Sequence, residues 1–174
     1  LIDAPDEPFV DRNLDAMVQD IYNQMSYQTS HDELTGLINR SQLERELART
    51  LAEAKRNQSE HALCHINLDQ FKVVSNTCGR QAGDQLLTEI SKLLTSYIQK
   101  PHIVARISGD EFLIILKNLD IQSAKNLAME LKESIQEHRF NWDNKTYTVG
   151  ASVGIAIIDE ASENVSSIIS AADS

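Results

Sequence analysis

Apolar residues recur every three or four positions along several stretches of the chain, which is the spacing of an amphipathic helix. The stretches with this spacing are 11–30, 41–56, 86–98, 120–135 and 164–174. Shorter apolar runs, bounded by polar and glycine residues, lie between them and predict β-strands. These runs are 61–68, 103–105, 112–116, 140–142 and 146–158. The alternation predicts an α/β fold with a mixed α+β sheet covered by helices, built on a βαββαβ core with an extra hairpin and an N-terminal helix.

Several of the predicted helices carry a residue suited to cap the N-terminus. The N-cap candidates are Asp11, Ser41, Asp84, and Asp120 or Ser123. At the second helix, Ser41 is followed three residues later by Glu44, which is the spacing of a capping box. Residues 76–84 contain two glycines and predict a turn that leads into the third helix.

The first 30 residues differ in character from the rest. Residues 1–10 hold two prolines and three acids, which is typical of a linker. Residues 11–30 predict an amphipathic helix that is either a stalk packing against a partner helix or a helix folded onto its own domain. We therefore expect a linker and helix over 1–30 and one domain over 31–174. The last helical pattern is still running at Ser174, so we expect the C-terminal helix to be truncated there.

Composition narrows the class of protein. The 174 residues suit one domain, and the formal charge of −10 argues against nucleic acid or an anionic membrane as the main partner. Cys64 and Cys78 have no metal-binding spacing and suggest reduced thiols in a cytoplasmic protein. The apolar run 149–158 is too short to span a bilayer, so we expect no membrane contact by this segment. A longer parent protein could still have a membrane anchor outside this segment.

The most unusual polar feature is an acidic pair at the tip of the predicted hairpin. Asp110 and Glu111 lie between the strands 103–105 and 112–116. Adjacent carboxylates repel each other, and a bound cation makes such a pair favourable. The other interpretation is an ordinary Ser-Gly-Asp turn, and the tip alone does not decide between them.

Four segments together resemble a known family. Residues 32–40 (DELTGLINR) resemble the opening D-x-L-T-G-L-x-N-R signature of GGDEF domains. Residues 67–84 (NLDQFKVVSNTCGRQAGD) are similar to the D-x-D-x-F-K-x-x-N-D-x-x-G-H-x-x-G-D segment of that family. Residues 108–112 (SGDEF) are similar to the G-G-D-E-F motif itself, and residues 149–156 (VGASVGIA) to the late T-x-S-x-G-x-A strand. The resemblance implies a nucleotidyl-cyclase-like core.

Active members of this family are diguanylate cyclases, which join two GTP molecules into cyclic di-GMP across a dimer, usually with Mg²⁺. By this resemblance Asp110 and Glu111 are the catalytic acids. The implied metal ligands are Asp110, the backbone carbonyl of Leu68, and Asn67. The implied substrate-binding residues are Lys72, Phe71, Ser75, Asp84 and Gly109.

The sequence departs from the family pattern at several of these positions. Asn67 stands where the family has a metal-binding aspartate, and Ser75 where it has a guanine-reading asparagine. Ser108 replaces the first glycine of the motif, which puts a Cβ where GTP passes closely. Asn76 and Arg80 also differ from the pattern, whereas Asp69 matches and is expected to be structural. An inhibitory R-x-x-D site is missing, because its positions are Gln99 and His102.

The first hypothesis is therefore a GGDEF domain with a degenerate active site and weak or no cyclase activity. It would bind GTP and regulate a neighbouring phosphodiesterase module of the EAL type, with sensory domains elsewhere in the parent protein. The alternatives are an active diguanylate cyclase and a non-nucleotide dimerisation or interaction domain that uses the helix 11–30. A homodimer is compatible with each of the three, and no nucleic-acid partner is expected for any of them. His61, His65 and His138 are expected to be surface or strand residues rather than ligands.

Overall fold

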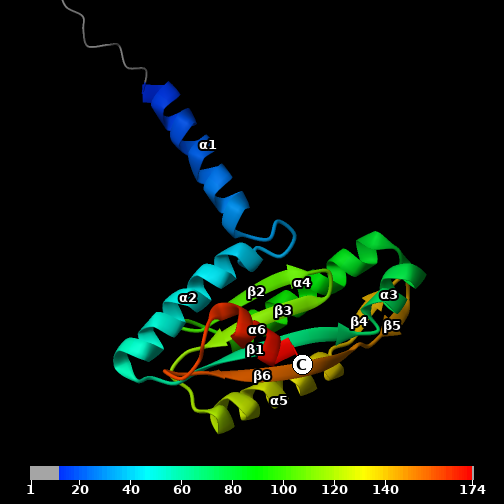
Figure 1. The fold of residues 1–174 in the computed structure, drawn as a ribbon. Helices are drawn as coiled ribbons and strands as arrows, with labels where there is room; N and C mark the ends of the chain where they lie inside the picture. Colours follow the sequence, from blue (N-terminus) through cyan, green and yellow to red (C-terminus); the bar gives the residue numbers. More distant parts are fainter. Residues whose placement is uncertain (1–11, 174) are drawn as a thin grey trace, which may run out of the picture.

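The computed structural model describes residues 12–173. The helices are α1 (Arg12–Ser30), α2 (Arg40–Asn57), α3 (Phe71–Cys78), α4 (Arg80–Tyr97), α5 (Ile121–Glu137) and α6 (Val165–Asp173). The strands are β1 (His61–Asp69), β2 (Ile103–Ser108), β3 (Glu111–Leu116), β4 (Phe140–Trp142), β5 (Lys145–Tyr147) and β6 (Gly150–Ile158). The predicted α/β fold class, with its βαββαβ core and extra hairpin, is confirmed (Figure 1).

The main sheet has the strand order β2-β3-β1-β6. A mixed sheet was expected, but each of its three strand pairings is antiparallel. Strands β1 and β2 run in the same direction but do not pair, because β3 lies between them. The pairing sets Asn67 of β1 opposite Glu111 of β3 on one side and Ser152 of β6 on the other. This register brings two of the sequence motifs side by side.

Helices cover both faces of the sheet. On one face, alternate residues of β1 such as Ile66 pack against α3, α4 and α5. On the other face, which α2 and α6 cover (Figure 1), Leu63 packs in a second apolar cluster with residues of these helices. Toward the C-terminal end of β1 the same face continues with His65 and Asn67, which are only partly buried. Polar side chains therefore lie where the apolar cover of this face ends.

The helix start predicted at Asp120 holds for α5, whereas the caps predicted at Ser41 and Asp84 are wrong. Asp120 caps α5 by accepting a hydrogen bond from the Ser123 amide. Ser41, however, lies inside α2, whose N-cap is Asn39; the Asn39 side-chain oxygen accepts from the Gln42 amide at 3.0 Å. Asp84 lies inside α4 rather than at its N-cap. The remaining candidate, Asp11, is outside the described residues.

Replacing Asn39 with alanine is expected to lower the free energy of unfolding by about 1 kcal/mol, because an orphan amide of α2 loses its acceptor. The Asn39 side-chain amide also donates to the Thr29 carbonyl at 3.0 Å, so the residue fixes the end of α1 as well. Urea denaturation measures the change. Ser41→Ala is the matched control: Ser41 is exposed within the helix, and its loss is expected to be neutral or slightly stabilising. Equal destabilisation by the two variants would contradict this assignment.

Two further predictions needed correction. Residues 76–84 do not form a turn, because α3 runs to Cys78 and α4 begins at Arg80 after the single residue Gly79, whose φ is +97°. The run 146–158 is not one strand either. Lys145–Tyr147 pairs with Phe140–Trp142 in a separate two-stranded sheet, and only Gly150–Ile158 joins the main sheet.

Helix α1 projects away from the sheet (Figure 1). Its predicted apolar stripe, Leu14, Met17, Ile21 and Met25, is more than half exposed at every position. The helix is therefore not folded onto its own domain. Its C-terminal end is anchored, since Tyr27 stacks on His31 with ring centroids 4.0 Å apart and the Asn39 backbone amide donates to the Ser30 carbonyl. Within residues 12–173 no helix has the length and apolar character needed to cross a membrane.

Candidate functional site

The tip of the β2–β3 hairpin is held in place by Arg106. Its Nε and Nη2 atoms donate to the Gly109 carbonyl oxygen at 3.2 and 3.1 Å. Its Nη1 atom donates to both carboxylate oxygens of Asp32, at 3.0 and 3.2 Å. The first motif of the sequence, which contains Asp32, therefore braces the loop that carries the acidic pair.

Asp32 is itself held in its ionised form. Burial raises its pKa, but hydrogen bonds from the amide and hydroxyl of Thr35 and the pairing with Arg106 outweigh this, so that the pKa is lowered overall. Both members of the ion pair are largely shielded from solvent, with exposed side-chain fractions of 16% for Arg106 and 20% for Asp32. This pair is a structural support rather than a binding group.

Replacing Arg106 with alanine is expected to lower the free energy of unfolding by about 2 kcal/mol, because Asp32 and the Gly109 carbonyl lose charge-assisted hydrogen bonds. Thermal denaturation measures it, and amide hydrogen exchange should rise at the tip, residues 108–111. Arg40→Ala removes an exposed ion pair to Glu44 on a helix surface and is expected to cost less than about 0.5 kcal/mol. Similar losses for the two arginine variants would show that the Arg106 contacts do not support the tip.

The structure brings four of the predicted site residues together at the join between β1 and β3. The Leu68 amide donates to the Asp110 carbonyl oxygen at 2.9 Å, and Asn67 lies directly opposite Glu111 in the pairing of β1 with β3. The Leu68 side chain is buried, so this residue can offer a ligand only through its backbone. Asn67, Asp110 and Glu111 are partly exposed. The donors here are amide, carbonyl and carboxylate oxygens, the chemistry that Mg²⁺ prefers, and so the residues present fit the ion that the family uses.

Both carboxylate oxygens of Glu111 have protein partners. The Ser108 hydroxyl donates to Oε2 at 2.8 Å, and His65 Nε2 lies 3.0 Å from Oε1. The hydrogen bond from Ser108, followed by that from His65, lowers the pKa of the Glu111 carboxyl. The side chain is thus ionised and directed toward His65.

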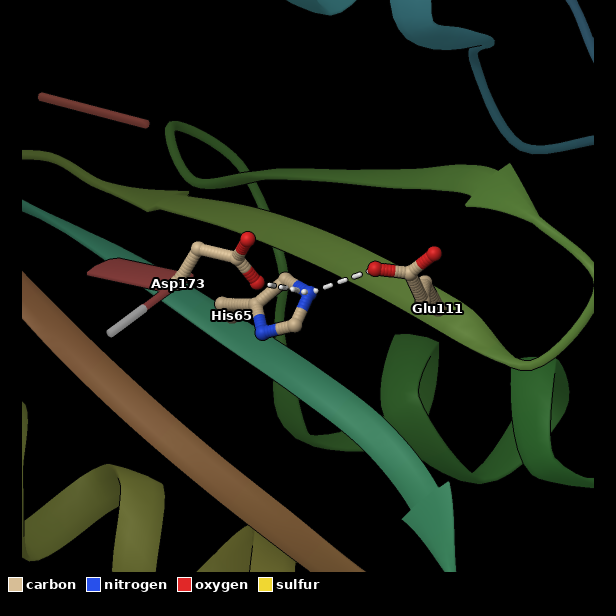
Figure 2. A group of neighbouring side chains, drawn as sticks. All are labelled: His65, Glu111 and Asp173. Atoms are coloured by element: carbon tan, nitrogen blue, oxygen red, sulfur yellow. Dashed lines mark hydrogen bonds and ion pairs between the residues drawn. The ribbon is translucent and has the colours of Figure 1, made fainter. Parts of the chain in front are cut away.

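His65 also faces the C-terminal end of α6. Its Nε2 atom lies 3.4 Å from Asp173 Oδ1, so one ring nitrogen stands between two carboxylates (Figure 2). Sequence reasoning expected His65 to be a strand residue and not a ligand; it is in β1, but its contact with Glu111 was missed. The available signal was its position two residues before Asn67, which puts both side chains on the same face of a strand. No local pattern pointed to Asp173.

Apart from Gly109 at the hairpin tip, the remaining predicted site residues lie on α3 and α4. Gln70, with φ +63°, turns the chain directly from β1 into α3. Phe71 and Ser75 pack against Gly83, where an added methyl group would lie 3.3 Å from Phe71 Cζ and 3.4 Å from Ser75 Cβ. Asp84 follows and is partly buried, whereas Lys72 is exposed.

The α3 N-terminus carries no side-chain cap at Gln70, and the first amides of a helix are groups suited to bind a phosphate. Asp69, expected to be structural, accepts a hydrogen bond from Ser152 at 2.8 Å and so ties β1 to β6. Gly109 is exposed at the hairpin tip. The structure therefore groups Asn67, Leu68, Asp110 and Glu111 in one set and Phe71, Ser75 and Asp84 in another, joined through the β1–α3 turn.

Comparison with protein families gives one match that covers most of the chain. The family model described as "Diguanylate cyclase, GGDEF domain" matches residues 29–174. Among curated proteins, the chain is 37% identical over 150 residues to "Probable diguanylate cyclase DgcE" of Escherichia coli, which covers 86% of the chain and 14% of that protein. It is 30% identical over 159 residues to "Diguanylate cyclase TpbB" of Pseudomonas aeruginosa, covering 91% of the chain and 37% of that protein. The chain therefore spans well under half of either relative.

A solved structure supports the same fold. The coiled coil and GGDEF domain of DgcB from Caulobacter crescentus, in complex with c-di-GMP, superposes with a TM-score of 0.85. The match covers 93% of the chain and 86% of that structure, at 22% sequence identity. At this identity the similarity concerns the fold, including the arrangement of the sheet and its helices.

Proposed function

The chain belongs to the GGDEF domain family of the diguanylate cyclases, and we propose that it serves cyclic di-GMP signalling as a GTP-binding regulatory domain with weak or no cyclase activity. The observation that carries this proposal is the state of Glu111. Its two carboxylate oxygens are engaged by Ser108 and His65, and Ser108 stands where the family motif has a glycine that cannot donate a side-chain hydrogen bond. An acid held in this way is less available to a magnesium ion or to a reacting hydroxyl.

Two substitutions in the site support the same conclusion. Asn67 offers an amide oxygen in place of a carboxylate, so a metal there gains a ligand but no compensating charge. Ser75 is shorter than the asparagine of the family pattern, and its hydroxyl offers less to a guanine edge. A lost charge-assisted or buried hydrogen bond typically costs about 1–3 kcal/mol, so each change weakens nucleotide binding by roughly ten- to a hundredfold.

The retained residues account for the binding of GTP that we propose. The α3 amides near Phe71, together with Lys72, hold the phosphates, Asp84 accepts hydrogen bonds from the guanine edge, and Gly109 lies along the nucleotide. Asp110, the Leu68 carbonyl and Asn67 hold the metal, and Mg²⁺, when bound, offsets the phosphate charge. That charge matters because the chain itself carries a formal charge of −10.

The surroundings of the domain belong to the same proposal. The chain spans only 14% and 37% of the two relatives described above, so sensory domains and an EAL-type phosphodiesterase in the parent protein are proposed neighbours. The exposed stripe of α1 is suited to a parallel partner helix, which would make the domain a homodimer. We place the domain in the cytoplasm, where GTP is available, and we propose the boundary between helix and domain near residue 30.

An active diguanylate cyclase is the second candidate, because Asp110, Glu111, Lys72 and Asp84 keep the family's residue types and a 37% identical relative is named a probable cyclase. A dimerisation domain without nucleotide is the third, and the exposed stripe of α1 is the observation that favours it.

Calorimetric titration of GTP into the chain with Mg²⁺ present, followed by an assay of the same sample for cyclic di-GMP, separates the three. Binding without product is the expected result. Binding with product would establish a cyclase, and no binding at millimolar GTP would leave the interaction domain. ATP in place of GTP is the control for guanine recognition by Asp84.

A further inference from the structure

The arrangement around His65 has the form of a metal-binding site of its own. His65 Nε2 lies 3.0 Å from Glu111 Oε1 and 3.4 Å from Asp173 Oδ1, and the three ligand atoms lie within 4.8 Å of one another (Figure 2). We propose that His65, Glu111 and Asp173 bind a divalent cation of the zinc class. This site goes beyond the proposed function, because it needs no nucleotide.

The geometry at the nitrogen favours a metal. A neutral imidazole carries at most one hydrogen on Nε2, yet two carboxylate oxygens face this atom. In a tetrahedral zinc site with bonds of about 2.1 Å, neighbouring ligand atoms are about 3.4 Å apart. The two distances from His65 Nε2, 3.0 Å to Glu111 Oε1 and 3.4 Å to Asp173 Oδ1, are close to this distance between neighbouring ligand atoms. The competing explanation is a protonated ring shared between two carboxylates, and it predicts no affinity for zinc.

Three elements build the site. His65 comes from β1 and Glu111 from the paired strand β3, so the sheet fixes their separation. Asp173 comes from α6, whose last turn approaches β6 closely because Gly154 has no side chain opposite the Ala172 carbonyl. Ser108 donates to the second oxygen of Glu111 and thereby orients this ligand, as an outer-shell partner does in known metal sites.

Exposure and donor chemistry fit a cation that enters from solvent. The exposed side-chain fractions rise from 12% at His65 through 34% at Glu111 to 62% at Asp173, which leaves an open side for a water as the fourth ligand. An imidazole nitrogen with two carboxylate oxygens suits zinc, whereas magnesium prefers oxygen ligands alone. The site therefore differs in selectivity from the all-oxygen set at Asn67, Leu68 and Asp110.

Glu111 belongs both to the zinc site and to the proposed site for Mg²⁺ and GTP. Zinc is therefore expected to affect nucleotide binding, an expectation that rests on the proposed function. Ser108 and His65 already engage Glu111, and zinc beside His65 would bind the same carboxylate more tightly and so withdraw it further from Mg²⁺ and GTP. Zinc is therefore expected to weaken the binding of Mg²⁺-GTP by the intact chain.

The direct test titrates Zn²⁺ alone into the metal-free chain, without nucleotide, by calorimetry. Co²⁺ serves as a spectroscopic probe, since tetrahedral Co²⁺ with a nitrogen ligand absorbs strongly in the visible range. We expect one site. His65→Ala should weaken it by more than about 100-fold and Ser108→Ala by about tenfold, because even outer-shell partners contribute 10–100-fold. Asp173→Asn, at an exposed position, should weaken zinc binding without affecting the fold.

A matched control is available at His138. Its Nε2 atom lies 2.7 Å from the carboxylate of Glu89, and within residues 12–173 His138 belongs to no group of three possible metal ligands. His138→Ala should leave the zinc affinity and the Co²⁺ spectrum unchanged. Zinc affinity that is absent, or that survives both His65→Gln and Asp173→Asn, would overturn the site. Zinc that binds as expected but does not alter GTP binding would remove only the link to Glu111, and a chain that binds zinc but no GTP would disprove the proposed function alone.

Discussion

Replacing Gly154 with alanine is expected to lower the free energy of unfolding by about 3 kcal/mol, the upper part of the usual range for overpacking. A Cβ at this position of β6 would overlap the carbonyl oxygen of Ala172 in α6. Backbone atoms cannot rotate away as a flexible side chain can, so the whole helix must shift. Ile168 and Ala172, which are buried in the contact between α6 and the sheet, would then lose part of their packing.

Thermal denaturation measures the loss, and a change of this size corresponds to a decrease in Tm of roughly 6–12 °C for a domain of this length. Gly109→Ala is the matched control, because an added Cβ at the hairpin tip meets no atom within 4 Å and no positive φ is involved. It should leave Tm nearly unchanged. Since the same packing places Asp173 beside His65, Gly154→Ala should also lose zinc affinity. An unchanged Tm would mean that α6 does not pack closely on β6.

The elements that carry strong local signals could be predicted from the sequence. Short apolar runs bounded by polar residues identified β1 and β3, and of the two predicted caps, Asp120 and Ser123, it is Asp120 that caps α5. Asp143 and Asn144 follow the predicted strand 140–142 and precede the next one, and both have positive φ, as a tight hairpin requires.

The wrong predictions concern positions where two local sequence features were equally strong and a tertiary contact determined which of them was used. Asn39 and Ser41 are both good N-caps, and the contact of Asn39 with the end of α1 favours the earlier start. Helix α3 was missed because only Val74 of its residues is buried, which leaves no apolar periodicity to detect. Its position depends instead on the turn at Gln70.

The candidate site shows the same division. The family resemblance supplied the residues on β1, α3, α4 and the hairpin, because each lies within a short continuous motif. It treated Ser108 only as a steric change, whereas the structure gives this hydroxyl a hydrogen bond to Glu111. The approach of Asp173 to His65 joins residues more than a hundred positions apart and depends on how α6 packs on the sheet, which no local pattern contains.

The double substitution Asn67→Asp and Ser75→Asn is expected to raise the affinity for Mg²⁺-GTP by about ten- to a hundredfold for each change, since a charged ligand and a two-sided guanine contact typically contribute about 1–3 kcal/mol each. Asn67 is paired with Glu111 and follows His65 on the same face, so the new carboxylate joins the oxygen donors at the β1–β3 join. Ser75 packs on Gly83, the residue directly before Asp84, so position 75 lies close to the carboxylate proposed to contact the guanine edge. Calorimetric titration with GTP measures the gain in affinity from each substitution.

Position 67 lies close to two acidic residues, which gives Asn67→Asp a second measurable effect. Without Mg²⁺, the carboxylate introduced by Asn67→Asp would lie near Asp110 and Glu111, so this substitution should lower Tm in a chelator, and added Mg²⁺ should restore it. Asn126→Asp, which adds the same charge at an exposed position of α5 and keeps the oxygen that accepts from Gln122, should change neither Tm nor GTP affinity and serves as the control. If the double variant bound GTP no better than the original chain, the two substitutions would not be what limits binding. The engagement of Glu111 by Ser108 and His65 would then be the remaining cause within the site, and adding Ser108→Gly to the double variant would test it directly.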